Sequence, residues 1–219
     1  MKTLILTEKP SVAKDFAKAL NIKCKGVGFY EDDQYILTWA IGHLLELKSP
    51  HEYCLKWKKW SLETLPILPE RLSYKVNYKT KKQFFLVNQQ LRRKDISQII
   101  VATDAGREGE LIARTLLENA KINVPCTRFW TSEALSTKVI LHHLSKVKPL
   151  SEYDRLYFAG RARQSSDWMI GMNLTRIATI KLGDLFSVGR VQTAVLSMLA
   201  MRRKEIDKFA AEKYYLIKA

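Results

Sequence analysis

The segment that decides the fold is Gln-Ile-Ile-Val-Ala-Thr-Asp-Ala-Gly-Arg-Glu-Gly-Glu, residues 98–110. Its first half, residues 98–103, is a continuous apolar run, which is typical of a central strand buried on both faces of a parallel sheet. From Arg107 to about Ala120, apolar residues recur at the spacing of an amphipathic helix. The segment therefore predicts a buried strand, a turn that carries Asp104, and a helix.

A second turn of this kind lies near the amino terminus. Residues 3–7 are apolar and β-prone, and Pro10-Ser11 opens a helix that runs to about Leu20. Glu8 and Lys9 therefore fall between a strand and a helix. Because ligands of parallel sheets bind beyond the carboxyl ends of the strands, we expect Glu8 and Asp104 to converge.

The rest of the chain divides near residue 150. Before it, further strands are predicted within residues 34–47 (broken at Gly42) and 128–130, and helices over 82–93 and 136–146, which indicates an α/β domain at 1–150. Residues 152–182 predict consecutive helices, so we assign 151–219 to a second, mainly helical and incomplete domain. Residues 214–219 predict an apolar strand, and we expect the chain to be part of a larger protein.

Composition limits the class of partner. The chain has 37 Lys and Arg against 22 Asp and Glu, a formal charge of +15, which favours a polyanion. No apolar run is long enough to span a bilayer, and there is no amphipathic helix with a basic face, so a membrane is not expected. Three scattered cysteines without a Cys-x-x-Cys pair fit the reducing cytoplasm. We expect a monomer.

The acidic residues suit phosphoryl-transfer chemistry. Glu108 lies one helical turn after Asp104, and Gly106 and Gly109 would let the backbone approach a metal or phosphate closely. Mg2+ prefers one or two carboxylates together with waters and substrate phosphate. Lys9 adds a positive charge that would stabilise a transferring phosphate. An isolated Asp-x-x-x-Glu is usually only a solvated helix start, but here two acidic strand-to-helix turns occur together.

Both motifs resemble the acidic motifs of the Toprim domain of type IA DNA topoisomerases, specifically the bacterial topoisomerase III family. The matching stretches are Leu-Thr-Glu-Lys-Pro-Ser-Val-Ala at 6–13 and Ala-Thr-Asp-Ala-Gly-Arg-Glu-Gly-Glu at 102–110. The resemblance covers essentially the whole chain. Further segments similar to the family, in family order, are 38–44, 128–132, 162–163, 167–176 and 187–193.

The resemblance implies an α/β Toprim domain, with a parallel-sheet core flanked by helices, followed by a mainly helical partial domain. It implies an isomerase that cuts single-stranded DNA through a tyrosine, passes a strand and reseals the break, with Mg2+ as cofactor. Nothing resembles a Walker loop, so ATP is not expected. Glu8 would act as general acid or base and as metal ligand, Lys9 would neutralise developing charge, and Asp104 and Glu108 would hold or position the metal.

Two departures from the family matter. Gly106 stands where the family usually has the second aspartate of Asp-x-Asp, which leaves one carboxylate fewer, and Glu110 is the candidate to replace it. The family's nucleophilic tyrosine would lie beyond residue 219, because none of the nine tyrosines here has its sequence context. We therefore expect this fragment alone not to cleave DNA.

The resemblance also implies a set of DNA contacts. In the stretch 187–192, Gly189 permits close backbone approach while Arg190 and Gln192 offer hydrogen-bond donors to phosphate or sugar. The implied DNA-contact residues are Ser61, Arg163, Trp168, Arg176, Ser187, Val188, Gly189, Arg190, Val191 and Gln192.

Several of these features have simpler alternatives. Trp168 and Arg176 also fit a buried tryptophan and a salt-bridged arginine. His43 fits either a DNA contact or a structural histidine, and is not expected to be catalytic. The mixed basic and aromatic tract at 51–82 fits either a stacking surface for nucleic acid or ordinary packing. For the whole chain, the competing hypotheses are a free-standing Toprim module of nuclease or primase type, and a basic protein that binds nucleic acid by charge alone.

Overall fold

The computed structural model describes residues 1–218, within which seven strands form one main sheet. β1 pairs with β4 and β7 in parallel, and β7 pairs with β8 in parallel, whereas the outer strands pair antiparallel. The predicted parallel-sheet core is therefore confirmed. In spatial order the strands are β2 (Cys24–Gly26), β3 (Phe29–Glu31), β4 (Tyr35–Trp39), β1 (Lys2–Thr7), β7 (Ile96–Ala102), β8 (Cys126–Arg128) and β9 (Lys148–Pro149).

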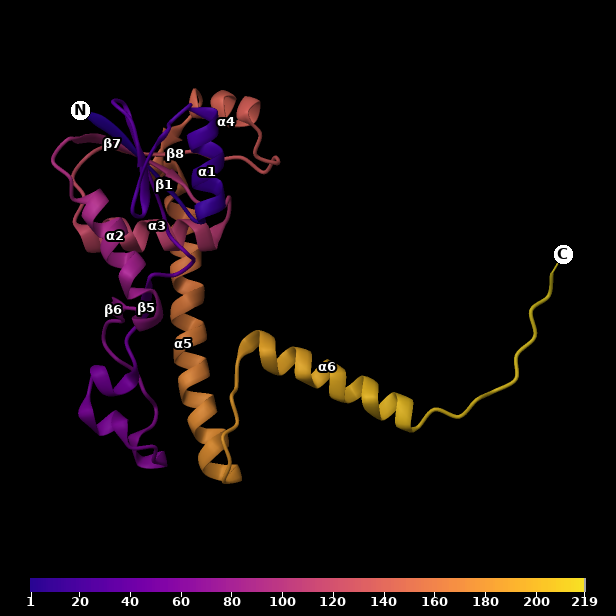
Figure 1. Ribbon diagram of the computed structural model, residues 1–219. Coiled ribbons are helices and arrows are strands. Elements are labelled where there is room, and N and C mark those ends of the chain that lie inside the picture. Colours follow the sequence, from indigo (N-terminus) through magenta and orange to yellow (C-terminus); the bar gives the residue numbers. More distant parts are fainter. Residues whose placement is uncertain (219) are drawn as a thin grey trace. The chain divides into compact units, whose positions relative to one another are not determined.

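Helices cover both faces of this sheet (Figure 1). Successive side chains of a strand point to opposite faces, so Leu4 and Leu6 enter one core while Ile5 between them enters the other. The first core is closed by α2 and α3, and the second by α1 and α4. Both faces of the central strands are thus buried, as their continuous apolar sequences require. The four helices are α1 (Pro10–Ala19), α2 (Lys81–Leu91), α3 (Arg107–Ala120) and α4 (Thr137–Leu144).

The strand order reverses between β1 and β7. From β1 the chain continues through α1 to β4 on one side, and from β7 it continues through α3 to β8 on the other. In addition, α1 and α3 cover opposite faces of the sheet. In open α/β sheets such a switch point leaves a crevice at the carboxyl ends of the two strands. Glu8 and Asp104 both lie in the turns at this place.

Two compact units divide the chain. The first contains Met1–Ser49 and Glu70–Ser165, and the second contains Pro50–Pro69 and the chain from Ser166 onward. The division expected at residue 150 stays a prediction. The first unit also holds an antiparallel pair, β5 (Leu45–Leu47) with β6 (Tyr74–Val76). Short 3-10 helices are η1 (Pro50–Glu52), η2 (Leu55–Lys58), η3 (Leu62–Thr64), η4 (Tyr78–Thr80) and η5 (Leu150–Tyr153).

Two sequence expectations need correction after residue 150. Where consecutive helices were predicted, a single helix, α5 (Asp154–Leu182), runs for 29 residues without a break, because no proline interrupts it. It is followed by α6 (Arg190–Asp207). The strand predicted at 214–219 is wrong over 214–218, where no described strand supplies the hydrogen-bonding neighbour that a strand needs; Ala219 lies outside the described residues. No helix within residues 1–218 is long and apolar enough to cross a membrane.

Candidate active site

Three of the predicted site residues form one hydrogen-bonded group at the switch point. Glu8 Oε2 accepts a hydrogen bond from the backbone N–H of Asp104 at 3.1 Å, and Lys9 Nζ donates to Asp104 Oδ2 at 2.7 Å. The hydrogen bond and charge of Asp104 raise the pKa of Lys9, which therefore stays a cation. The two turns thus converge as the sequence predicted, and they place the Lys9 ammonium on the half-exposed carboxylate of Asp104.

Glu108 lies in the first turn of α3 and pairs with two cationic or polar partners. Its Oε2 is 3.4 Å from His43 Nε2, and its Oε1 is 3.8 Å from Arg163 Nη1. Its side chain remains 55% exposed. Within residues 1–218, no three His, Cys, Asp or Glu side chains lie together as a ready metal-binding group. The Glu8 carboxylate therefore meets the backbone of Asp104, while Glu108 faces His43 and Arg163.

Gly106 and Gly109 differ in the space that is available for a side chain. A Cβ at Gly109 would lie 2.1 Å from the backbone oxygen of Asp104, so only glycine lets the first turn of α3 pack against this turn. A Cβ at Gly106 would meet nothing within 4 Å. Gly106 caps α3 with an extended backbone. The position where the family usually has an aspartate is thus open to a larger side chain.

Glu110 serves a structural role, in contrast to the expectation that it could replace the missing carboxylate. Its side chain is fully buried and forms ion pairs with Arg128 and Arg114. Burial lowers the pKa of Arg128, and the Glu110 charge opposes that shift. Because every part of the Glu110 carboxylate is inaccessible, it cannot reach a metal at the strand ends.

The role of Arg128 was missed by the sequence interpretation, which treated residues 128–130 as a strand and residues 128–132 as a segment similar to the family. Besides Glu110, its guanidinium donates to the backbone oxygens of Thr103 and Asp104, each at 2.8 Å, and to that of Val101 at 3.1 Å. Arg128 therefore fixes the carboxyl end of β7 and the turn that carries Asp104. A charged residue inside an otherwise apolar stretch was the available indication.

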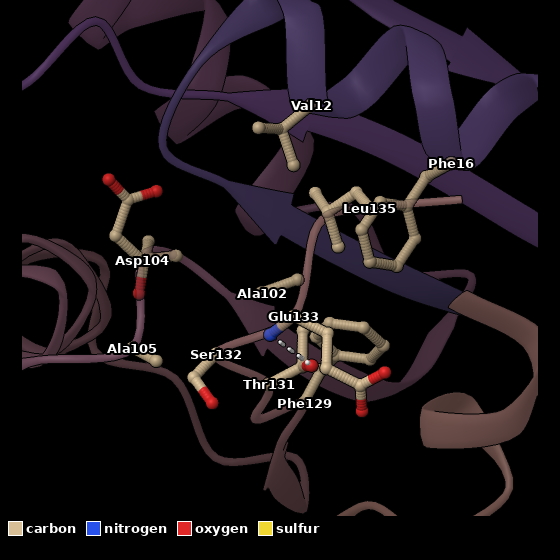
Figure 2. A pocket seen from close by; sticks show the side chains of 11 residues that line it. Val12, Phe16, Ala102, Asp104, Ala105, Phe129, Thr131, Ser132, Glu133 and Leu135 are labelled. Carbon is tan, nitrogen blue, oxygen red and sulfur yellow. Dashed lines mark hydrogen bonds between the residues drawn. The ribbon is translucent and has the colours of Figure 1, made fainter. Parts of the chain in front are cut away.

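A cavity of about 270 Å3 opens beside Asp104 (Figure 2). Val12 and Phe16 of α1 lie on one side, and Ala102 of β7 lies at its base. The loop after β8 forms the other side. The complete lining is Val12, Phe16, Ala102, Thr103, Asp104, Ala105, Phe129, Thr131, Ser132, Glu133 and Leu135.

In the second unit, the segment Pro50–Pro69 packs against the latter part of α5. The guanidinium of Arg176 lies over the Trp60 ring at 5.1 Å, and the rings of Tyr53 and Trp168 meet edge to face at 5.8 Å. Ser61 follows Trp60 and caps η3. The structure therefore brings Arg176 onto Trp60, the residue that precedes Ser61.

Arg176 itself is buried, and desolvation lowers its pKa. Among residues 1–218, its Nε and Nη1 have no hydrogen-bond partner. The alternative of a salt-bridged structural arginine is therefore not what the structure shows. A buried guanidinium with unused donors is an energetically costly arrangement that an anionic ligand would relieve.

The predicted contact stretch 187–192 joins α5 to α6. The backbone N–H of Val188 donates to Thr175 Oγ1 at 2.9 Å, and Gly189 caps α6. Arg190 Nε lies 2.9 Å from Asp167 Oδ1. Arg163 belongs to the first unit, where it faces Glu108. The predicted DNA contacts thus fall into a group in the second unit and a single residue at the acidic site.

The basic and aromatic tract at 51–82 has no single role. Trp57 is buried, and Tyr53 and Trp60 pack on α5 in the second unit. Tyr78 is 87% exposed and borders a shallow hollow that it shares with Phe85 and three lysines. Ordinary packing therefore explains part of the tract, and a polar surface with exposed rings remains at its end.

Comparison with known proteins identifies the family of this chain. The model of the Toprim domain matches residues 3–134, which is more than half of the sequence. The chain belongs to the Toprim family. The model of the DNA topoisomerase domain matches residues 151–219, directly after the Toprim match.

Individual relatives agree with these matches. The Toprim chain is 48% identical over 218 residues to the DNA topoisomerase 3 of Bacillus cereus (strain ATCC 14579) and 47% identical to that of Bacillus subtilis (strain 168). Each alignment covers 100% of this chain but only 30% of the relative. Full-length topoisomerase I from Thermotoga maritima has a similar fold, with a TM-score of 0.64 at 22% identity over 94% of this chain and 31% of that one.

Proposed function

We propose that this chain is the Toprim part and the start of the helical part of a type IA DNA topoisomerase of the topoisomerase III kind. The observation that carries the proposal is the meeting of Glu8, Lys9 and Asp104 at the switch point of the parallel sheet. The match of residues 151–219 to the DNA topoisomerase domain supports it over a free-standing Toprim nuclease or primase module.

Mg2+ is the proposed cofactor, and the donor set fits it. Two carboxylates at a strand-end crevice are the sparse oxygen set that this ion uses together with waters and phosphate. Bound there, Mg2+ would supply positive charge to the scissile phosphate. Glu8 and Asp104 would hold it, and Glu108 would join them only after leaving His43 and Arg163.

The chain's own residues would act directly on the phosphate. Glu8, half-buried and oriented by the Asp104 backbone N–H, is positioned to exchange a proton with the attacking or leaving oxygen. Lys9 would move from the Asp104 carboxylate to the developing negative charge. The nucleophilic tyrosine would come from sequence outside these 219 residues, so this fragment would bind DNA without cleaving it.

DNA binding is proposed for the second unit. The unused donors of Arg176 suit phosphate, and the partly exposed ring of Trp60 lies next to it. The stretch 187–192 and Ser61 would add contacts, as would Arg163 at the acidic site. Single-stranded DNA is the proposed partner, and the protein would work as a monomer in the cytoplasm without ATP.

The metal assignment is tested by titrating Mn2+ or Mg2+ into the protein. Glu8→Gln and Asp104→Asn should each weaken binding about tenfold or more, because each removes a charged oxygen ligand. Glu152→Gln is the matched control, since Glu152 is an exposed carboxylate paired with Lys148 far along the chain. Unchanged affinity in both site variants would overturn the metal site.

DNA binding is tested separately by fluorescence anisotropy with single-stranded oligonucleotides. The logarithm of affinity should fall linearly with the logarithm of salt concentration, because bound lysines and arginines release counterions. Arg176→Ala should weaken binding at all salt concentrations. A flat salt response, or a preference for duplex, would contradict the proposal.

A further inference from the structure

A surface at the start of α2 carries exposed aromatic rings among lysines. Five residues line its shallow hollow, and we call them the Tyr78–Phe85 surface: Tyr78, Lys79, Lys81, Lys82 and Phe85. Tyr78 is 87% exposed and Phe85 is 53% exposed. Aromatic side chains gain most of their energy by being covered. Two such rings that are open to solvent at one place therefore indicate a binding surface.

Neighbouring residues hold this surface in place. The Phe85 ring meets the buried Phe84 ring edge to face at 5.6 Å, and Lys81 Nζ lies 5.9 Å from the centre of the Phe85 ring. Tyr78 opens the 3-10 turn η4, and the Asn77 side chain caps this turn by accepting a backbone N–H hydrogen bond of 2.9 Å. Binding to a surface that folding has already ordered costs less entropy.

The charge of the surface is positive and unpaired. Residues 71–94 contain eight Lys or Arg and no Asp or Glu. Lys79, Lys81 and Lys82 are exposed, and none of them forms an ion pair with any residue in 1–218. All three charges are therefore available to an anionic partner.

Rings and cations together distinguish among anionic partners. The bases of a single nucleic-acid strand stack on exposed aromatic rings while its phosphates pair with lysines. In a duplex the faces of the bases are covered by neighbouring bases, so they cannot stack on Tyr78 or Phe85. An acidic peptide segment would use the lysines and leave both rings without a planar partner. The chemistry of the surface therefore favours a single strand.

The surface lies on the same edge of the sheet as the acidic site. Gln83 Nε2 donates to the backbone oxygen of Trp39 at 2.7 Å, which fixes the first turn of α2 at the carboxyl end of β4. β4 is the parallel neighbour of β1, and Glu8 follows the carboxyl end of β1. Because adjacent strands lie about 4.8 Å apart, a DNA strand of several nucleotides can extend from the acidic site to this surface.

We propose that the Tyr78–Phe85 surface is a second contact for the single DNA strand at the acidic site. Its rings stack on bases of any sequence, and its lysines pair with phosphates. The inference rests on the proposed function, in that the acidic site brings the strand to this edge of the sheet. The DNA contacts implied by the family resemblance include none of the five residues.

Fluorescence anisotropy with two probes tests the stacking, one an oligo-dT and the other an abasic sugar-phosphate chain of the same length and charge. Tyr78→Ala and Phe85→Ala should each weaken oligo-dT binding about fivefold or more, which is the lower range for one stacked base. Both should leave binding of the abasic chain unchanged, because that chain has no base to stack. Both side chains are exposed, so the variants keep the fold.

Phe158→Ala is the matched control for the rings. Phe158 is 58% exposed and lies beside the buried Tyr157 at 5.5 Å, but among residues 1–218 no cation lies over its ring. This variant should bind both probes as the unmodified protein does. If the ring variants lost equal affinity for oligo-dT and for the abasic chain, the stacking contact would be overturned.

The lysines are tested through the salt dependence of oligo-dT binding. Changing Lys79, Lys81 and Lys82 together to Gln should reduce the slope of log affinity against log salt by about 2, because each phosphate contact on a single strand contributes about 0.7. The control changes to Gln three exposed lysines of α1 and α4, on the other face of the sheet, namely Lys14, Lys18 and Lys138. It should change the slope clearly less, and equal changes would show that only net charge matters and would overturn the surface.

Competitors identify the class of partner. Polyglutamate and phosphatidylserine vesicles, matched to oligo-dT in charge, should displace labelled oligo-dT much less than unlabelled oligo-dT does. Equal displacement by either would overturn the assignment to a single strand.

Two outcomes separate this inference from the proposed function. If the protein binds oligo-dT and every variant of the Tyr78–Phe85 surface binds it equally well, the inference fails and the proposed function stands. If the ring variants lose oligo-dT affinity as expected but Glu8→Gln and Asp104→Asn leave metal affinity unchanged, the surface stands and the acidic site of the proposed function fails.

Discussion

The two ends of the motif 104–110 have opposite environments. Glu108 is 55% exposed and faces His43 and Arg163 at distances above 3.3 Å, whereas Glu110 is 0% exposed and pairs with Arg128. Two residues along a helix correspond to a rotation of about 200°, so the two glutamates point to opposite sides of α3. One short acidic motif thus supplies both an open chemical site and the buried ion pair that supports it.

The comparison shows how the open end is held in place. Arg128 links Glu110 to the backbone oxygens of Thr103 and Asp104, so the buried pair and the turn that carries Asp104 form one hydrogen-bonded unit. The exposed carboxylates have weak partners that they can exchange. Glu110 and Arg128 cannot exchange each other for water as a partner, because both side chains are out of contact with water.

The largest expected effect comes from breaking the buried end. Arg128→Met should lower the free energy of unfolding by about 3 kcal/mol or more, because it leaves the Glu110 charge buried with only Arg114 beside it. Urea denaturation measures the change. Arg163→Met, which removes one of the two partners of Glu108 at the open end, should cost below about 1 kcal/mol.

A double variant separates the effect of the unpaired Glu110 charge from the effect of losing the Arg128 side chain. Adding Glu110→Leu to Arg128→Met should restore part of the lost stability, because no unpaired buried charge remains. If Arg128→Met and Arg163→Met lowered the free energy of unfolding by similar amounts, the buried and exposed ends of the motif would not differ in the way their burial indicates.

The next effect concerns the contact between the helix and the turn. Gly109→Ala should lower the free energy of unfolding by about 1–3 kcal/mol, since its Cβ would overlap the backbone oxygen of Asp104 and force the turn to move. Metal affinity should fall with it. Gly106→Ala is the control, because nothing lies within 4 Å of its Cβ, and its metal affinity should stay unchanged. Equal effects at both glycines would contradict the close approach.

Sequence reasoning recovered the part of this arrangement that depends on local pattern. Apolar runs predicted β1 and β7, helical spacing of apolar residues predicted α3, and the rule that ligands bind at strand ends placed Glu8 near Asp104. The assignments of Arg128 and Glu110 could not be made in this way. Their pairing joins residues from different elements, and a glutamate in a first helical turn has the same local pattern whether it is exposed or buried.

The second unit shows the same limit. Trp60 lies on Arg176 because the segment Pro50–Pro69 packs against α5. No periodicity in either segment predicts this packing. The family resemblance named Ser61 and Arg176 separately. Only the structure shows that Arg176 lies on Trp60, the residue before Ser61, and that Arg176 keeps unused donors.

Adding a carboxylate at the exposed end of the motif should have a smaller effect, and it should raise metal affinity instead of lowering it. Gly106→Asp should raise Mn2+ affinity several-fold, because the position is open and a further charged oxygen would face the strand-end crevice. Aspartate is also a better helix cap than glycine by a few tenths of a kcal/mol, so stability should not fall. Gly106→Asn is the control, which keeps the capping oxygen and lacks the charge. Unchanged or weaker metal binding in Gly106→Asp would show that this position does not face the site.

The smallest effect is expected from an ion-pair cluster of intermediate burial at the opposite end of β1 and β7. Lys2 and Arg93 both bind Glu31, and Arg93 also binds Asp95 at 2.7 Å. The hydrogen bond from Arg93 lowers the pKa of Asp95 from 3.8 to about 2 and also lowers that of Glu31. Because these folded-state values lie below the unfolded ones, the stabilisation is complete above about pH 5 and is lost as the pH falls towards 2.

Arg93→Ala should therefore lower stability slightly at neutral pH and have almost no effect near pH 2, as measured by urea denaturation across that range. The cluster is partly exposed, so the difference should lie well below that of Arg128→Met, whose partner Glu110 is fully buried. A pH-independent cost for Arg93→Ala would mean that its packing, and not its charge, stabilises this end of the sheet. The depth of an ion pair, and not the number of charges in it, then decides whether it supports the fold or stays available for chemistry.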